Sequence, residues 1–190
     1  MNLTRKGEYA LRSLIKLGLA QELGHPHLSV SDLAESEKLP LKFLEQVLFG
    51  LRSGGFIETK RGKYGGYFLA KPMEEIRIGD IIRHLEGRLA PIACASNSDY
   101  EKCSCPDEAH CGLRMLMIDV RNAISNILDR YTLANVVEVT LRKLRRNGVE
   151  LELGKIDHAS TSQAILKAVD FNPADPGDGF LAELNSQSDS

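Results

Sequence analysis

The sequence lacks the features of a membrane or secreted protein. None of its apolar runs approaches the roughly 18 residues that a membrane-spanning helix needs. Its first six residues, MNLTRK, are followed by charged, interrupted sequence rather than by the apolar region of a signal peptide. We therefore expect a soluble protein that stays in the cytoplasm and has no membrane partner.

Motifs typical of enzymes are also missing. The sequence has no nucleophile elbow, no P-loop and no dinucleotide-binding fingerprint, and its Gly-Gly pairs fall at predicted turns. We therefore expect neither an enzyme nor a small-molecule substrate. With 43% hydrophobic and 26% charged residues, the 190-residue chain can form a packed core and is not disordered as a whole.

Charge is divided unevenly along the chain. Residues 1–72 carry 11 Lys and Arg against 7 Asp and Glu, a balance of +4, whereas residues 73–190 carry 13 against 19, a balance of −6. A polyanion would be attracted to the first segment and repelled by the second. An ordinary solvated surface can show the same asymmetry by chance, so charge permits DNA binding without establishing it.

Helical periodicity and turn residues predict a winged helix-turn-helix in the first segment. Three helices are expected, over residues 5–22, 31–36 and 41–52. Thr4 suits the N-cap of the first, Ser29 or Ser31 that of the second, and Pro40 the first turn of the third. A hairpin should follow, with strands over residues 56–60 and 67–70 and a basic, glycine-rich turn between them.

The rest of the chain predicts a second unit and a tail. Its expected elements are a helix near 78–85, a cysteine-bearing loop over 90–111, a long amphipathic helix over 112–130 and a last helix to about 146. The expected fold class is mainly α with a small β-hairpin wing. The expected domains are a DNA-binding domain over 1–72, the cysteine loop with dimerisation helices over 73–148, and a partly disordered C-terminal extension over 149–190.

The second helix of a helix-turn-helix enters the major groove, so the polar face of the helix over 41–52 is the first candidate site. Gln46 suits paired hydrogen bonds to adenine, Glu45 suits the cytosine amino group, Phe43 a thymine methyl group and Lys42 a phosphate. At the wing tip, Arg61 beside Gly62 suits a narrow minor groove. The alternative is an ordinary amphipathic helix whose polar face is only solvated.

Four cysteines within one loop form the second candidate site. They are Cys94, Cys103, Cys105 and Cys111. Thiolates bind zinc and iron–sulfur clusters, and cytosolic proteins rarely keep disulfides. The spacing matches neither a zinc ribbon nor a ferredoxin, so it does not decide between the two metals. A thiol redox switch and inert cysteines are the remaining alternatives.

Three segments resemble the Rrf-two family of winged-helix iron–sulfur transcription regulators, which includes IscR, NsrR and RirA. The segments are residues 2–18, Phe43-Leu44-Glu45-Gln46 and the wing over 61–69, and the resemblance extends over about residues 1–145. It implies a homodimer whose interface is the long helix after the cysteine loop. It also implies base contacts by Phe43, Glu45 and Gln46 and a minor-groove contact by Arg61-Gly62.

The resemblance also favours an iron–sulfur cluster, with two or four irons. Cluster-binding family members carry three cysteines in this loop, the last two separated by five residues, as Cys105 and Cys111 are. The first then corresponds to Cys94, and Cys103 is an additional ligand, a replacement or a spare. In some members an acidic residue of the partner subunit is a ligand, and Glu8 stands at the matching position.

Taken together, the sequence predicts a regulator, expected to be a repressor, that binds a double-stranded DNA operator and senses iron, redox state or nitric oxide through its cluster. The state of the cluster would set the packing of the helix over 112–130 and so the spacing of two recognition helices. The same dimer with structural zinc or a thiol switch is the alternative, and a protein-interaction adaptor is a further one.

Overall fold

The computed structural model describes residues 3–62, 65–148 and 180. In chain order its elements are α1 (Arg5–Glu22), α2 (Val30–Glu37), α3 (Leu41–Ser53), β1 (Ile57–Lys60), β2 (Gly66–Leu69), η1 (Met73–Glu75), α4 (Ile78–Glu86), η2 (Ala93–Ala95), α5 (Gly112–Arg130) and α6 (Leu133–Arg146). The fold is mainly α with a two-stranded antiparallel hairpin, as the sequence predicts.

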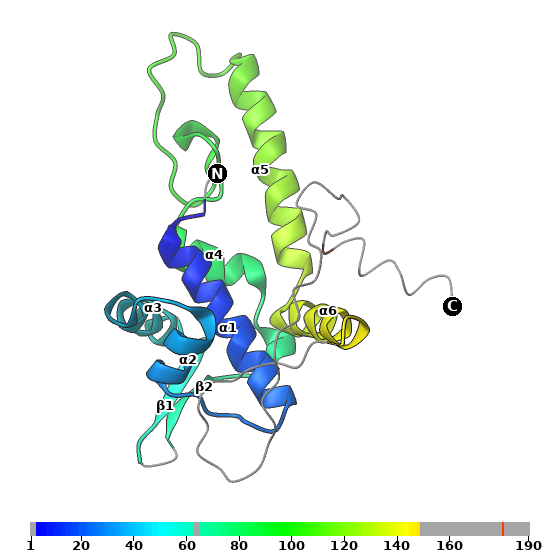
Figure 1. Ribbon diagram of the computed structural model, residues 1–190. Helices are drawn as coiled ribbons and strands as arrows, with labels where there is room; N and C mark the ends of the chain where they lie inside the picture. Colours follow the sequence, from blue (N-terminus) through cyan, green and yellow to red (C-terminus); the bar gives the residue numbers. More distant parts are fainter. Residues whose placement is uncertain (1–2, 63–64, 149–179, 181–190) are drawn as a thin grey trace.

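Helix α1 is the central element (Figure 1). Thr4 begins it as expected, because the Thr4 hydroxyl accepts a hydrogen bond from the Gly7 amide at 3.2 Å. The helix contacts α2, α3, α4, α6 and β2, and its Leu14 and Leu17 side chains are almost completely buried. At Gly18, an added Cβ would lie 2.6 Å from the Val137 Cγ2 atom, so α1 and α6 approach closely there.

Helices α2 and α3 form the helix-turn-helix. Ser29, rather than Ser31, caps α2 in a capping box with Asp32. Lys38 adopts a left-handed conformation with φ 52° and ends α2, and Pro40 is the N-cap of α3. One apolar stripe of α3 is fully buried and comprises Leu44, Val47, Leu48 and Leu51. Burial of this stripe turns the opposite face of α3 toward solvent.

The hairpin is anchored to the start of the helix-turn-helix. Its register pairs Ile57 with Leu69 at the base and Lys60 with Gly66 near the tip. Leu28 bridges to Tyr67 through two backbone hydrogen bonds of 2.8 and 3.1 Å. A Cβ on Gly66 would lie 2.5 Å from the Leu28 carbonyl oxygen, so only glycine permits this approach. The middle of the wing turn, residues 63–64, lies outside the described residues.

The loop before α5 extends away from the bundle, and α5 runs back toward it to reach α6 (Figure 1). None of the α5 residues is fully buried, although the helix has 19 residues. By contrast, Leu133 and Val137 of α6 belong to the same hydrophobic core as α1. The core therefore continues across residue 72, and the expected domain boundaries stay a prediction.

Of the expected C-terminal extension over 149–190, the structure describes Phe180. Its ring lies edge-on against Tyr131, with the ring centroids 4.9 Å apart. Tyr131 connects α5 to α6, so this contact falls at the junction of the two helices. The expected disorder of the extension lies outside the described residues. In the described part of the chain, no helix is long and apolar enough to span a membrane.

Replacing Leu44 with alanine is expected to lower the free energy of unfolding by about 2–5 kcal/mol, because it removes a fully buried side chain. Leu41→Ala, one turn earlier on α3, is the matched control. Leu41 is 44% exposed, so we expect a loss of less than about 1 kcal/mol. Urea unfolding followed by circular dichroism measures both variants, and equal losses would contradict the assigned orientation of α3.

Candidate nucleic-acid interface and metal centre

The outer face of α3 carries most of the expected base contacts. Lys42, Glu45 and Gln46 are exposed and line a hollow on this face together with Phe49. All four project from the side opposite the buried stripe, where nothing in the described chain covers them. The structure thus groups the expected polar contacts on one accessible helical surface.

Two phenylalanines on α3 differ in exposure. Phe43, expected to contact a thymine methyl group, is half-buried and lies edge-on to Tyr9 with ring centroids 5.5 Å apart. Phe49 is 73% exposed and lines the hollow. Phe49 is not among the contacts predicted from the sequence, although its place outside the stripe of Leu44, Val47, Leu48 and Leu51 was a usable signal. The contact of Phe43 with DNA stays a prediction.

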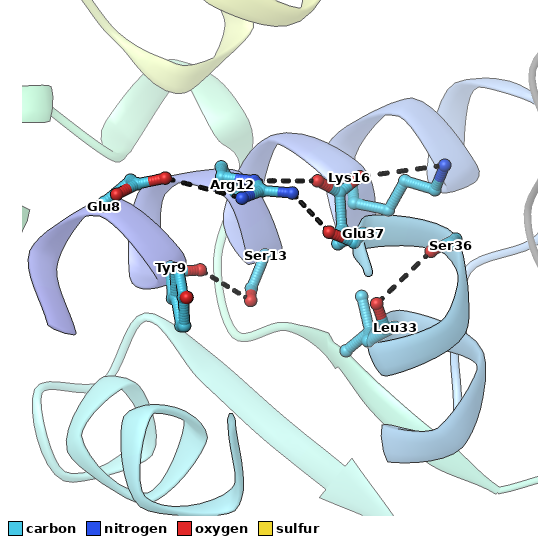
Figure 2. A network of polar contacts seen from close by, with 8 residues as sticks. All are labelled: Glu8, Tyr9, Arg12, Ser13, Lys16, Leu33, Ser36 and Glu37. Carbon is cyan, nitrogen blue, oxygen red and sulfur yellow. Dashed lines mark hydrogen bonds and ion pairs between the residues drawn. The ribbon is translucent and has the colours of Figure 1, made fainter. Parts of the chain in front are cut away.

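An ion-pair network fixes α2 against α1 (Figure 2). The Arg12 Nε atom lies 3.1 Å from the Glu37 carboxylate, and the Arg12 guanidinium also donates to the backbone carbonyl of Glu37. Lys16 is almost buried, with its Nζ atom 3.8 Å from Glu37. Glu37 is the last residue of α2, where positive charge is favourable. The network therefore holds the end of α2, and with it the turn into α3.

The wing tip presents its expected residues to solvent. Arg61 and Gly62 are both exposed. Gly62 adopts φ 119°, a conformation that favours glycine, and its carbonyl accepts a hydrogen bond from the Gly65 amide at 2.9 Å. The Arg61 side chain is therefore accessible beside the tip of the wing. Its contact with a minor groove stays a prediction.

All four cysteines are free thiols and gather in the loop before α5. Cys94 is buried within η2, and the other three are half-buried. The Sγ atoms of Cys94 and Cys103 and a carboxylate oxygen of Glu108 lie within 4.8 Å of one another. Arg88 ties down the loop through Asp99 and Glu101, at 3.4 and 2.7 Å.

The surroundings of Cys94 and Cys105 oppose deprotonation of these two thiols. Burial, followed by the proximity of Cys103, raises the pKa of Cys94. The hydrogen bond and charge of Cys103 raise the pKa of Cys105 to about 11, with a further contribution from Cys111. Such thiols stay protonated at neutral pH unless a cation compensates the negative charge. A sulfur-rich group of this kind fits a thiophilic metal or an iron–sulfur cluster.

Glu108 was not identified from the sequence. Its carboxylate accepts a hydrogen bond from the Tyr100 hydroxyl at 2.8 Å and lies 3.4 Å from the Arg114 guanidinium. The Tyr100 hydrogen bond, with contributions from the Cys103 amide and Arg114, lowers the pKa of Glu108. Glu108 therefore remains an anion beside the thiols. An acidic residue between two cysteines of the loop was the available sequence signal.

Glu8 is the acidic residue expected to serve as a ligand from the partner subunit. Glu8 is half-exposed near the start of α1 and lies 3.4 Å from Arg12 on the same helix (Figure 2). This ion pair is of the exposed i,i+4 type, which contributes about 0.3–0.5 kcal/mol. Such a weak pair leaves the carboxylate available, and coordination by Glu8 of the partner subunit stays a prediction.

A family model described as an iron-dependent transcriptional regulator, Rrf2 (Rrf-two), matches residues 3–139. The HTH-type transcriptional regulator NsrR of Bacillus licheniformis is 34% identical over 137 residues, which cover 72% of this chain and 92% of NsrR.

Solved structures give the same result. CymR, the global cysteine regulator of B. subtilis, has a TM-score of 0.60 at 32% identity and covers 73% of this chain and 97% of its own. IscR of T. potens has a TM-score of 0.56 at 28% identity, with coverage of 73% and 87%. These relatives are named as regulators and not as enzymes. The chain therefore belongs to the Rrf2 family of transcriptional regulators.

Proposed function

We propose that this regulator binds operator DNA as a homodimer and represses transcription according to the state of an iron–sulfur cluster held by its cysteine loop. The observation that carries the proposal is the gathering of Cys94, Cys103 and Glu108 within 4.8 Å, with Cys105 and Cys111 beside them. The stimulus is iron, redox state or nitric oxide. Structural zinc and a thiol redox switch are the alternative uses of the same residues.

The DNA-binding part of the proposal rests on the exposed face of α3 and on the wing. Gln46 and Glu45 would contact base edges in the major groove, and Lys42 would contact phosphate. Phe49 offers an apolar surface of the kind that contacts a thymine methyl group. Arg61-Gly62 would contact the minor groove. The proposed DNA-binding unit covers residues 1–72.

The homodimer part rests on the unburied apolar side chains of α5. Leu113, Leu116 and Ile127 lie on one side of α5 and are each more than half exposed. A helix with such a face normally buries it against another surface. A second copy of α5 offers a matching surface through two-fold symmetry. Such a dimer would place two recognition helices about 34–36 Å apart, one turn of DNA.

The cluster would be held by sulfur ligands from Cys94, Cys105 and Cys111, with Cys103 as an additional or replacement ligand. When bound, the cluster supplies redox and ligand-exchange chemistry that the side chains lack. The loop encloses part of the site, because Cys94 is buried in it. Arg88, which precedes the loop, forms ion pairs with two acidic residues within it and so restrains the loop. Residues 73–148 would form this sensing and dimerisation unit.

Polar contacts at both ends of α5 support transmission from the loop to α3. Near its start Arg114 donates to the Cys94 carbonyl oxygen at 3.0 Å, and at its middle Arg121 donates to the Ala95 carbonyl oxygen at 2.5 Å. Near its end, Asp129 forms a two-pronged ion pair with Arg83 of α4, at 2.5 and 3.2 Å. Helix α4 contacts both α1 and α3. A change in the loop would therefore shift α5, and α5 would bias the pose of the DNA-binding unit.

Protein purified without oxygen is expected to be coloured, to contain iron and sulfide, and to bind its promoter DNA with a different affinity from metal-free protein. Visible absorption, metal and sulfide assays, and binding titrations at one fixed salt concentration measure this. Colourless protein that contains zinc, without iron or sulfide, would instead indicate a structural zinc site. Equal DNA affinity of the loaded and metal-free protein would contradict the switch.

Gln46→Ala is expected to weaken operator binding by about 1–3 kcal/mol, roughly 5–150-fold, and to relax the preference at one base pair. Phe49→Ala should relax the preference at a position that contains thymine. Lys42→Ala should instead weaken binding to all DNA sequences equally. It should also reduce the slope of log affinity against log salt concentration by about one. Glu74→Ala, exposed in η1, is the control. Titrations with base-substituted operators separate these outcomes.

Leu116→Asp is expected to convert the dimer to a monomer, because it places a charge in the exposed apolar face of α5. Asn122→Asp adds the same charge to the opposite side of α5 and keeps an oxygen acceptor for Arg121, so it should remain dimeric. Sedimentation velocity measures both. A dimeric Leu116→Asp protein would place the interface elsewhere.

A further inference from the structure

We propose that the Glu108 carboxylate is itself a ligand of the metal centre, an oxygen donor beside the Cys94 and Cys103 sulfurs. This inference rests on the proposed metal centre and names one of its ligands. The centre would then have a mixed sulfur and oxygen donor set supplied by a single loop.

The positions of the three donor atoms carry the inference. Ligand atoms bound to one zinc ion at about 2.0–2.3 Å lie within about 4.6 Å of each other. The Cys94 and Cys103 sulfurs and a Glu108 oxygen lie within 4.8 Å of one another, close to that limit. They come from η2, from the middle of the loop and from the turn before α5. Only the tertiary fold of the loop brings three such separate positions together.

The neighbours of Glu108 hold its carboxylate in place. Glu108 is 17% exposed, whereas Asp107 and Glu101 in the same loop are 60% and 63% exposed. Tyr100 and Arg114 both contact the Oε1 atom of Glu108, at 2.8 and 3.4 Å. Metal-binding carboxylates are commonly oriented by such hydrogen-bonding partners. A loop carboxylate that only solvates the surface would instead point outward.

Arg114 does more than form an ion pair with Glu108. Arg114 also donates to the Cys94 carbonyl oxygen at 3.0 Å, so one guanidinium orients both Glu108 and the segment that carries Cys94. A guanidinium has no lone pair to offer a metal, so Arg114 is a positioning residue. Two negative thiolates and a carboxylate would repel one another in this half-buried loop, and a metal cation supplies the missing positive charge.

A carboxylate oxygen is a harder ligand than a thiolate and binds thiophilic metals less tightly. Within the proposed donor set, Glu108 would therefore be the ligand that an incoming small molecule displaces most readily. An oxygen ligand from the same loop would also leave Glu8 of the partner subunit unnecessary for coordination.

Anaerobic titration with Co²⁺ tests the inference, because thiolate-to-cobalt absorption reports the sulfur ligands and the ligand-field bands report the whole donor set. Glu108→Gln keeps the side-chain length and an acceptor for Tyr100. We expect unchanged thiolate-to-cobalt absorption, shifted ligand-field bands and roughly 10–100-fold weaker cobalt binding. Asp107→Asn, exposed and adjacent, is the control and should match the wild type.

Unshifted ligand-field bands in Glu108→Gln overturn the inference, even where the affinity for cobalt falls. Weaker cobalt binding alone would mean that Glu108 supports the ligands without binding the metal itself. If Glu108→Gln does not fold by circular dichroism, Glu108→Asp, one carbon shorter, must shift the bands in its place, and unshifted bands overturn the inference equally. A wild-type protein that binds neither cobalt nor iron and sulfide contradicts the proposed metal centre itself, which separates that failure from the failure of Glu108 alone.

Discussion

Burial of α1 is the interaction on which the rest of the structure depends. The helix contacts α2 and α3 of the helix-turn-helix, β2 of the wing, α4 and α6. Its core side chains, such as Leu14 and Leu17, lose nearly all contact with water. At Gly18 the backbone is close enough to Val137 that a larger residue would push α6 away. The recognition helix α3 and helix α6 are therefore parts of one packed core. Because close-packed interiors transmit strain, a displacement of α6 would also displace α3.

Helix α5 is held in a different way. It contributes no fully buried residue and is attached by the arginine contacts to η2 and by the pair of Arg83 with Asp129. Partly exposed ion pairs contribute little stability compared with a buried apolar face. Hydrophobic packing within one chain therefore fixes the position of α5 less firmly than that of α1. That property suits both a helix that meets a second copy and a helix that responds to the cysteine loop.

Family membership defines the architecture more closely than the sensing chemistry. The relatives include NsrR, IscR and CymR, and the last is named as a cysteine regulator. A shared fold does not transfer a sensing chemistry, because chemistry depends on the residues grafted onto the fold. In this chain the donor atoms of Cys94, Cys103 and Glu108 lie within 4.8 Å of one another.

The sequence by itself determined the secondary structure, the family and the residue types of both sites. Caps such as Thr4, the periodic burial of Leu44 and its stripe, and glycine at the turns are local signals, and they predicted helix limits to within about two residues. Only the tertiary structure decided that Phe43 turns toward Tyr9, that Phe49 is exposed and that Glu108 joins the cysteines. These outcomes depend on contacts between residues distant in sequence, or on how a loop without periodicity closes, and no local pattern encodes such contacts.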